Sequence, residues 1–249
     1  MIDEGLSEAE ARARIWLVDR RGLMLSDMEE VEFPYRKKYY QPPERVKHWK
    51  LGHEGSISLA DVVLNLHPAV LIGTSAIAGA FTREIVREMA SYAQRPIIFP
   101  LSNPSTKCEA APRDLIEWSE GRALIATGSP FPDVEYGDRR IRVSQCNNVF
   151  IFPGVALGVL AAGARRITDS MFMAAATALA ECSPSRHDPG APLLPPIEEV
   201  RRVSRQVAIA VGLEAQRKGL APRTTPEGLE KAVTAKMWTP RYGRVRLKR

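Results

Sequence analysis

Short apolar runs bounded by turn residues alternate with segments of helical spacing over the first 153 residues of the chain. The apolar runs predict strands at residues 15–19, 69–75, 96–101 and 123–127, with VFIFPG (149–154) closing the series. Apolar residues on one face predict helices at residues 7–14, 58–65, 82–93 and 112–119. Strands that alternate with helices through short turns are typical of the α/β class, so we predict a doubly wound parallel sheet.

The pattern changes after residue 153, where almost every segment has helical spacing. Helices rich in small residues are predicted at residues 156–167 and 170–182, and such helices pack closely. A long amphipathic helix over residues 197–218 is expected to end at Gly219. Residues 27–56 are polar, aromatic and interrupted by proline, which predicts an irregular excursion within the α/β part.

These patterns divide the chain into an α/β domain at residues 1–153 and a helical segment at residues 154–249 that packs on it. The last nine residues, 241–249, hold five basic side chains and no acid, so their removal lowers the net charge from +6 to +1. A basic tail binds RNA, an anionic surface or an acidic partner subunit, or it is simply solvated. We expect a solvated tail, and neither a nucleic acid nor a membrane as partner.

Composition restricts the environment of the protein further. With 45% hydrophobic and 26% charged residues, the chain is close to an average soluble protein. No apolar run is long enough to cross a bilayer, and the charged N-terminus lacks the apolar stretch of a signal peptide. Cys108, Cys146 and Cys182 have neither disulfide nor zinc spacing, which predicts reduced thiols. We therefore expect a cytoplasmic protein.

Small, polar or acidic residues stand at the ends of the predicted strands. In chain order they are Asp19, Gly73-Thr74-Ser75, Ser102-Asn103 and Gly128-Ser129, with Asn147-Asn148 ahead of the last apolar run. Ligands of open α/β sheets bind beyond the carboxyl ends of the strands. This arrangement predicts a ligand crevice whose floor is the sheet.

Each of these positions has a structural and a functional interpretation. Asp19 either binds the ribose hydroxyls of an NAD adenosine or caps a turn. A glycine-rich phosphate loop would lie about twenty residues earlier, ahead of Met1, so we expect the sheet to lack its first strand and this loop. The segment GTSAIAG (73–79) is either a tight turn or backbone that approaches a dinucleotide. Asn103 and Asn147 either orient a carboxylate or carboxamide, or cap turns.

Four segments taken together resemble the nicotinamide-binding half of malic enzymes: LIGTSAIAGAFTREIVREMA, RPIIFPLSNPSTKCEA, GRALIATGSPF and QCNNVFIFPGVALGVLAAGARRITDSMF. The resemblance extends from about Gly5 to Tyr242, and SNP combined with QCNN…FPG makes it specific. DRRGLMLSDM and MWTPRYGR are similar to the bacterial NAD-linked branch. The resemblance implies a Rossmann-like domain that binds NAD in preference to NADP, although Arg20 and Arg21 are candidates to pair with the phosphate of NADP.

The resemblance also assigns roles to the residues at the strand ends. It implies that Asp19 holds the adenosine ribose and that the twin asparagines form the edge of the crevice, anchored to the core by VFIFPG. The implied cofactor-binding residues are Asp19, Gly73, Thr74, Ser75, Asn103 and Asn148. The implied substrate-binding residues, which reach malate and the nicotinamide end, are Asn103 and Asn147.

The activity implied is the oxidative decarboxylation of (S)-malate to pyruvate and carbon dioxide with reduction of NAD. Malic enzymes use a tyrosine and a lysine as acid and base and three carboxylates for Mg²⁺ or Mn²⁺, all in the N-terminal half of longer chains. No counterpart is found here, so we expect a C-terminal portion without catalytic or metal-binding residues, inactive alone. Its expected partner is the missing N-terminal half or further copies of itself. Two alternatives stay open: a non-catalytic nucleotide-binding or regulatory module, and an interaction protein with a basic tail and a vestigial crevice.

Overall fold

The computed structural model describes residues 1–29, 33–52, 55–188 and 190–239, and the predicted basic tail at 241–249 lies outside these ranges. The chain forms two compact units. The first comprises Met1–Ile125 and Glu135–Arg139, and the second comprises Ala126–Val134 and Arg140–Arg249. The division after residue 153 stays a prediction.

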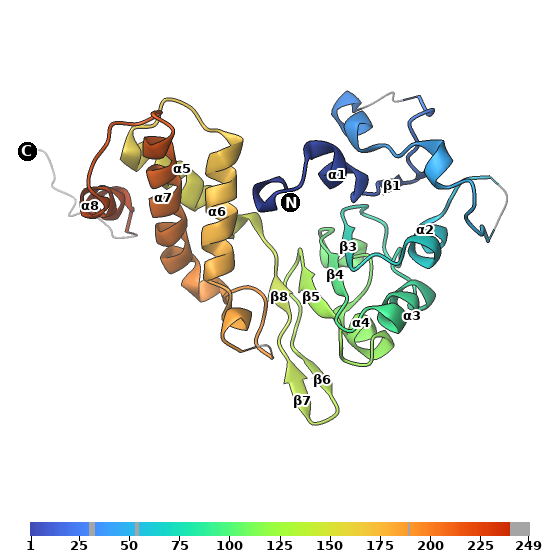
Figure 1. Cartoon of the computed structure of the whole chain (residues 1–249). Coiled ribbons are helices and arrows are strands. Elements are labelled where there is room, and N and C mark those ends of the chain that lie inside the picture. The colour runs from blue at the N-terminus through green and yellow to red at the C-terminus, as the bar shows by residue number, and fades with distance from the viewer. Residues whose placement is uncertain (30–32, 53–54, 189, 240–249) are drawn as a thin grey trace, which may run out of the picture. The chain divides into compact units, whose positions relative to one another are not determined.

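Helices and strands alternate along the first unit. Its helices are α1 (Glu8–Ala13), α2 (Leu59–Leu66), α3 (Arg83–Tyr92) and α4 (Pro112–Trp118). Its strands are β1 (Val18–Asp19), β2 (Gly22–Leu23), β3 (Val70–Gly73) and β4 (Ile97–Pro100), and β5 (Leu124–Thr127) begins in it. Figure 1 shows β3, β4 and β5 side by side, with α3 and α4 in the same unit.

Four parallel strands form the main sheet in the order β3-β4-β5-β8, where β8 is Ser144–Gln145. The first half of β5 pairs with β4, and its second half pairs with β8. Strands β6 (Val134–Tyr136) and β7 (Arg139–Ile141) form a separate hairpin. Parallel strands joined by helices confirm the predicted α/β class.

Three helices of the first unit, α1, α2 and α3, begin at residues whose side chains cap them. Ser7 and Ser58 each accept a hydrogen bond from the N–H three residues later, and the acids at that position, Glu10 and Asp61, bind the capping N–H in return. Thr82 caps α3 by accepting a bond from the N–H of its third residue. The buried face of α3 is the one predicted from its apolar spacing: Ile85, Val86, Met89 and Ala90.

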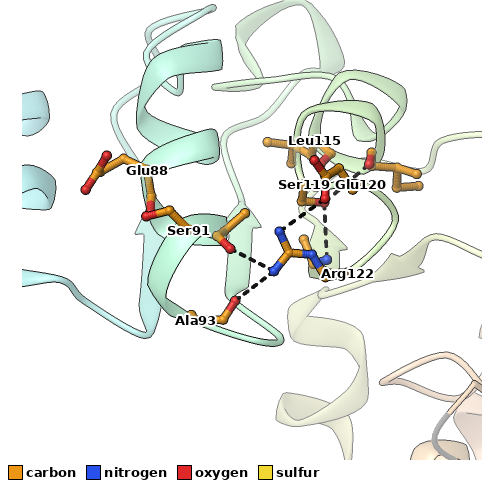
Figure 2. Close-up of polar contacts among 10 residues, drawn as sticks. Glu88, Ser91, Ala93, Leu115, Ser119, Glu120 and Arg122 are labelled. Carbon is orange, nitrogen blue, oxygen red and sulfur yellow. Dashed lines mark hydrogen bonds and ion pairs between the residues drawn. The ribbon is translucent and has the colours of Figure 1, made fainter.

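The carboxyl end of α3 is closed by Arg122, which comes from the turn before β5 (Figure 2). Its guanidinium donates to the carbonyl of Ala90 at 2.7 Å and to that of Ala93 at 3.4 Å. A cation is favoured at this end of a helix because the terminal carbonyls carry partial negative charge. In the same turn, the buried Ser119 hydroxyl accepts a bond from the N–H of Ala123 at 3.2 Å. Arg122 therefore ties α3 to the turn that starts β5.

The predicted strand at residues 15–19 is wrong in both extent and partner. Only Val18–Asp19 is extended, and it pairs antiparallel with β2 in a separate two-stranded sheet. The chain reverses here because Asp19 Oδ1 accepts a bond from the N–H of Arg21 at 2.7 Å, and because Gly22 adopts a φ of 95°. The apolar side chain of Trp16 packs in a small local core instead of a sheet.

The second unit contains helices α5 (Phe152–Ala162), α6 (Asp169–Glu181), α7 (Val200–Arg217) and α8 (Pro226–Lys236). Helix α7 packs against the other three helices and buries Val203, Val207 and Val211. It is followed by Gly219 as predicted, whereas the helix predicted at 156–167 ends earlier, before Gly163, which has a φ of 67°. Within the described ranges, no helix combines the length and the apolarity that a bilayer crossing requires.

The predicted strand at the VFIFPG run is also wrong. Asn148–Phe150 forms a 3₁₀ turn, and the following residues begin α5. The turn forms because Asn147 Oδ1 accepts a bond from the N–H of Val149 at 2.9 Å, and Pro153 is compatible with the first turn of a helix. The strand of this region is Ser144–Gln145, so the asparagines follow a strand. Phe150 is nevertheless buried in the core of the second unit.

Glycines allow α5 and α7 to approach closely, as the small residues of α5 predict. A Cβ atom at Gly158 would lie 2.4 Å from the carbonyl oxygen of Ala208. At Gly154 it would lie 2.6 Å from a side-chain carbon of Val207. Neither distance is tolerated in a packed interior, so any larger residue forces the helices apart.

We expect Gly158→Ala to lower the free energy of unfolding by about 1–3 kcal/mol, because the added methyl group meets backbone atoms of α7. The loss would occur although alanine is the better helix former. The control is Ala156→Gly at an exposed position of α5, which should cost about 1 kcal/mol through helix propensity alone. Chemical denaturation followed by circular dichroism measures both changes, and a stabilised Gly158→Ala variant would contradict the close packing.

Candidate functional site

The carboxyl ends of β3 and β4 lie next to each other, because the strands are parallel and Gly73 is paired with Pro100. After β3 the chain continues through residues 74–77, here named the β3 loop, all of which are exposed. After β4 it continues through residues 101–104, the β4 loop. The N–H of Leu101 donates to the Gly73 carbonyl at 2.9 Å and so extends the pairing of the two strands by one step.

Glu109, a residue that the sequence pattern did not single out, lies between these two loops and is fully buried. Its Oε1 atom accepts bonds from the N–H and the hydroxyl of Ser75, both at 2.8 Å. The same oxygen accepts a short bond from the Ser102 hydroxyl, and Oε2 accepts the Ser102 N–H at 3.3 Å. A single carboxylate therefore binds both loops through four donors.

The two serine hydroxyls extend this network to the backbone of the β3 loop. The Ser102 oxygen accepts the N–H of Ala76 at 2.8 Å, and the Ser75 oxygen accepts the N–H of Ile77 at 3.1 Å. Ala76 has a φ of 56°, in the left-handed region that is unfavourable for a residue with a Cβ atom. The network therefore holds the β3 loop in a conformation that the chain does not prefer on its own.

Glu109 is an anion that neutral groups stabilise. Burial disfavours its charged form and is the largest single influence on its pKa, but the bonds from Ser102 and Ser75 together outweigh it and hold the pKa below the ordinary glutamate value. In the part of the chain that the structure describes, no ion pair involves Glu109. Its charge thus depends on the hydrogen bonds of the two loops.

Gly73 provides the space that this network occupies. A Cβ atom at Gly73 would lie 2.5 Å from Cδ of Glu109 and 2.7 Å from Cζ of Phe81. The N–H of Phe81 in turn donates to the carbonyl of Glu109 at 3.1 Å. The glycine is therefore required by the close approach of the Glu109 side chain, and its contact with a cofactor stays a prediction.

Asp19 lies in the β1–β2 hairpin of the same unit, where it binds Arg21. Besides the backbone bond described above, Asp19 Oδ2 lies 3.3 Å from a guanidinium nitrogen of Arg21. That guanidinium also donates to the carbonyl of Glu29 at 3.1 Å. Arg20 and Arg21 are both exposed. Arg21 is paired with the acid and Asp19 caps the turn, whereas binding of a ribose by Asp19 stays a prediction.

The three asparagines singled out in the sequence are all exposed. The amide of Asn103, in the β4 loop, donates to the carbonyl of Leu101 at 3.3 Å. Asn147 and Asn148 belong to the second unit, where they follow β8 and where Asn147 caps the 3₁₀ turn. Asn147 is therefore a capping residue, and ligand contacts of all three stay predictions.

The structure brings together only part of the predicted site. Gly73, Thr74, Ser75 and Asn103 meet at the carboxyl ends of β3 and β4, whereas Asp19 lies on a separate hairpin of the same unit. Within the described ranges, no group of three or more His, Cys, Asp or Glu side chains is arranged to hold a metal ion. The carboxyl ends of β3 and β4 therefore carry the part of the predicted site that the structure brings together.

A local signal for Glu109 exists in the sequence but is weak. The acid stands between Cys108 and Ala110, both small and both buried, where an acidic residue is unusual without partners. Its partners lie up to 34 residues away in the chain, at Ser75. Only the pairing of β3 with β4 reveals that these residues are neighbours.

Comparisons with known proteins identify the family of the chain. The family model described as "Malic enzyme, NAD binding domain" matches residues 1–216. Over 244 residues the chain is 48% identical to an NAD-dependent malic enzyme of Shewanella sediminis (strain HAW-EB3) and 46% identical to one of Shewanella baltica (strain OS185). In both cases 98% of this chain is covered but only 43% of the relative, so the chain spans less than half of their length.

Two solved structures share the fold. The malic enzyme of Entamoeba histolytica superposes with a TM-score of 0.67 at 25% identity, covering 89% of this chain and 41% of that one. The malic enzyme of Pyrococcus horikoshii Ot3 superposes with a TM-score of 0.62 at 26% identity, covering 86% of this chain and 43% of that one. The predicted Rossmann-like architecture is thus supported by structure as well as by sequence.

We expect Glu109→Gln to lower the free energy of unfolding at pH 7 by about 1–3 kcal/mol, because donors of Ser75 and Ser102 lose a charged acceptor. The folded pKa lies below the unfolded one, so the carboxylate contributes its full stabilisation above the ordinary glutamate pKa and loses it as the pH falls through the folded value. The difference in the free energy of unfolding between the wild type and Glu109→Gln should therefore become smaller below roughly pH 4.

Urea denaturation at a series of pH values measures this gap. The matched control is Glu117→Gln, which removes an exposed carboxylate from α4 of the same unit and should leave stability nearly unchanged. A gap between wild type and Glu109→Gln that is constant down to acid pH would contradict the ionised state of Glu109.

Proposed function

The chain belongs to the malic enzyme NAD-binding domain family, and we propose that it forms the NAD-binding part of a malic enzyme. The match of the family model over residues 1–216 carries this proposal. The reaction proposed for the whole enzyme is the oxidative decarboxylation of (S)-malate to pyruvate and carbon dioxide, with reduction of NAD. Relatives that are named NAD-dependent malic enzymes support it.

NAD would bind at the carboxyl ends of β3 and β4. Gly73, Thr74 and Ser75 would contact the dinucleotide, and Asn103 and Asn148 would contact it near the nicotinamide. The exposure of the β3 loop supports this placement, and so does its fixed backbone, because ligands of parallel sheets bind at this edge. The hydroxyl of Ser75 is already engaged by Glu109, so Thr74 is the better candidate for a side-chain contact.

Asp19 would select NAD over NADP by accepting a hydrogen bond from the 2′-hydroxyl of the adenosine ribose. A carboxylate repels the 2′-phosphate of NADP. The ion pair between Arg21 and Asp19 also favours NAD over NADP. The Arg21 guanidinium is engaged by the carboxylate and would have to leave it in order to bind a phosphate. Arg20 remains the basic residue that favours NADP.

Asn103 and Asn147 would orient the substrate. An uncharged amide both donates and accepts, so it positions the malate carboxylate or the nicotinamide carboxamide without altering a nearby proton transfer. The described residues do not fit a metal site. The relatives are more than twice as long as the part of them that this chain covers. We therefore place Mg²⁺ or Mn²⁺, with the acid and the base, on the part of the enzyme that these 249 residues do not cover. That part, together with further copies of the chain, would be its partner.

The first test of the proposal is a calorimetric titration of the chain with NAD and NADP. We expect tighter binding of NAD, and a loss of NAD affinity of about tenfold or more in Asp19→Ala, where a charged hydrogen bond is lost. The same change should improve NADP binding, because it releases Arg21. Asp27→Ala, at an exposed position of the same unit, is the control. Tighter binding of NADP to the wild-type chain would overturn the cofactor assignment.

A second prediction concerns Asn103 and Asn147 in a complete malic enzyme reconstituted with this chain. Replacement of either by Ala should reduce kcat/KM by the equivalent of about 2–4 kcal/mol, because the reacting groups lose their orientation. The melting temperature should change little in Asn103→Ala, and it should fall modestly in Asn147→Ala, which also loses the cap of the 3₁₀ turn. An early-melting variant with normal kinetic constants would reduce the two residues to turn caps.

A third prediction is that the 249-residue chain alone does not oxidise malate. The hydroxyl proton requires a base, and loss of carbon dioxide requires an electron-withdrawing centre such as a metal ion. Among the described residues, no group of three or more His, Cys, Asp or Glu side chains is arranged to hold such an ion. The assay follows NADH formation with malate, NAD and Mn²⁺, with and without a separately expressed N-terminal half of a malic enzyme. Sustained activity of the chain alone would refute the prediction, whereas NAD binding with no activity in either sample would favour a non-catalytic nucleotide-binding module.

A further inference from the structure

The buried contacts of the β3 and β4 loops assign a role to Glu109 beyond the predicted binding residues. We propose that Glu109 is a positioning residue for NAD: its carboxylate, through Ser75 and Ser102, holds both loops in the arrangement that receives the dinucleotide. This inference rests on the proposed function, because it concerns the same loops. Glu109 itself is fully buried and does not touch the ligand.

Glu109 comes from neither loop, and its buried carboxylate binds both of them. The pairing of β3 with β4 ends with the bond from Leu101 to Gly73. Beyond that point, the loops are joined through the four bonds to Glu109 and through the bond from Ala76 to Ser102. The spacing of the loops therefore depends on the Glu109 carboxylate together with the Ser102 hydroxyl.

The network determines which atoms the β3 loop presents to a ligand. Ser75 directs both its N–H and its hydroxyl inward to Glu109. Ala76, held at a φ of 56°, directs its N–H to Ser102. The side chains of Thr74 and Ile77, for which no bond to this network is described, are exposed on the same loop. Release of the network would let Ala76 return to a commoner conformation and would change this surface.

Glutamine does not reproduce the acid. Oε1 of Glu109 accepts three of the four bonds, and Oε2 accepts the fourth, from the Ser102 N–H. A carboxamide with its oxygen at the Oε1 position keeps three acceptor contacts without the charge that strengthens them, and its NH₂ group faces the Ser102 N–H. Glu109→Gln therefore keeps the size of the side chain, but it weakens the hold on both loops and removes one bond to the β4 loop. Preorganised binding loops lower the cost of binding, so their release should weaken NAD binding.

The experiment compares NAD and AMP as ligands of the chain, at a temperature where circular dichroism shows every variant folded. The variants are Glu109→Gln, Ser102→Ala and the surface control Glu117→Gln. We expect NAD affinity to fall by about tenfold in Glu109→Gln and by less in Ser102→Ala, where Glu109 keeps its other donors. AMP affinity should stay the same, because no described contact joins Asp19 to the network. Glu117→Gln should bind both ligands as the wild type does.

The outcomes separate positioning from general stability. Unchanged NAD affinity in Glu109→Gln with a lower melting temperature would overturn the proposal, and so would an equal loss of NAD and AMP binding. If the wild-type chain binds no NAD, the proposed function fails. Amide hydrogen exchange then tests separately whether Glu109 holds the two loops. Selective loss of protection at Ser75, Ala76 and Ser102 in Glu109→Gln would then support its hold on the loops, and uniform exchange would overturn it.

Discussion

The loops at the carboxyl ends of β3 and β4 depend on one constraint. The buried carboxylate of Glu109 must be stabilised by neutral hydrogen-bond donors. Removing a charge from water is costly, and Glu109 has no ion-pair partner among the described residues, so its four hydrogen bonds must all be present. This requirement explains three features at once: a serine in each loop, a glycine at the end of β3 that leaves room for the side chain, and an alanine held in the left-handed region.

The second unit depends on a different constraint, the contact of helix backbones. Gly154 and Gly158 bring α5 against α7 at distances that no side chain could occupy. Helix α5 starts just after the 3₁₀ turn that contains Asn148, and Phe150 of that turn is buried in the same core. The packing of the helices therefore also fixes the position of the twin asparagines. An apolar run thus anchors a polar edge, although through a helix rather than a strand.

Much of the candidate site could be predicted from sequence, because strand ends and a family-specific combination of motifs are both local features. Gly73, Thr74, Ser75 and Asn103 were placed correctly at the ends of β3 and β4. Glu109 was not recognised, because the residues that explain it are far away in the chain. The place of Asp19 at the end of an extended segment could be predicted, but the hairpin to which it belongs could not. An apolar run indicates extended structure and not the direction of the next strand.

The sequence by itself determined the helices that begin at Ser7, Ser58 and Thr82, the buried face of α3, the parallel α/β class and the family. These depend on caps, on spacing within one turn and on short motifs, all of which act between near neighbours. The tertiary structure alone decided the partner of β1, the helical fate of VFIFPG and the burial of Glu109. Each depends on contacts with a strand or helix that is distant in the sequence. The local hydrophobic pattern does not indicate which distant element a segment contacts.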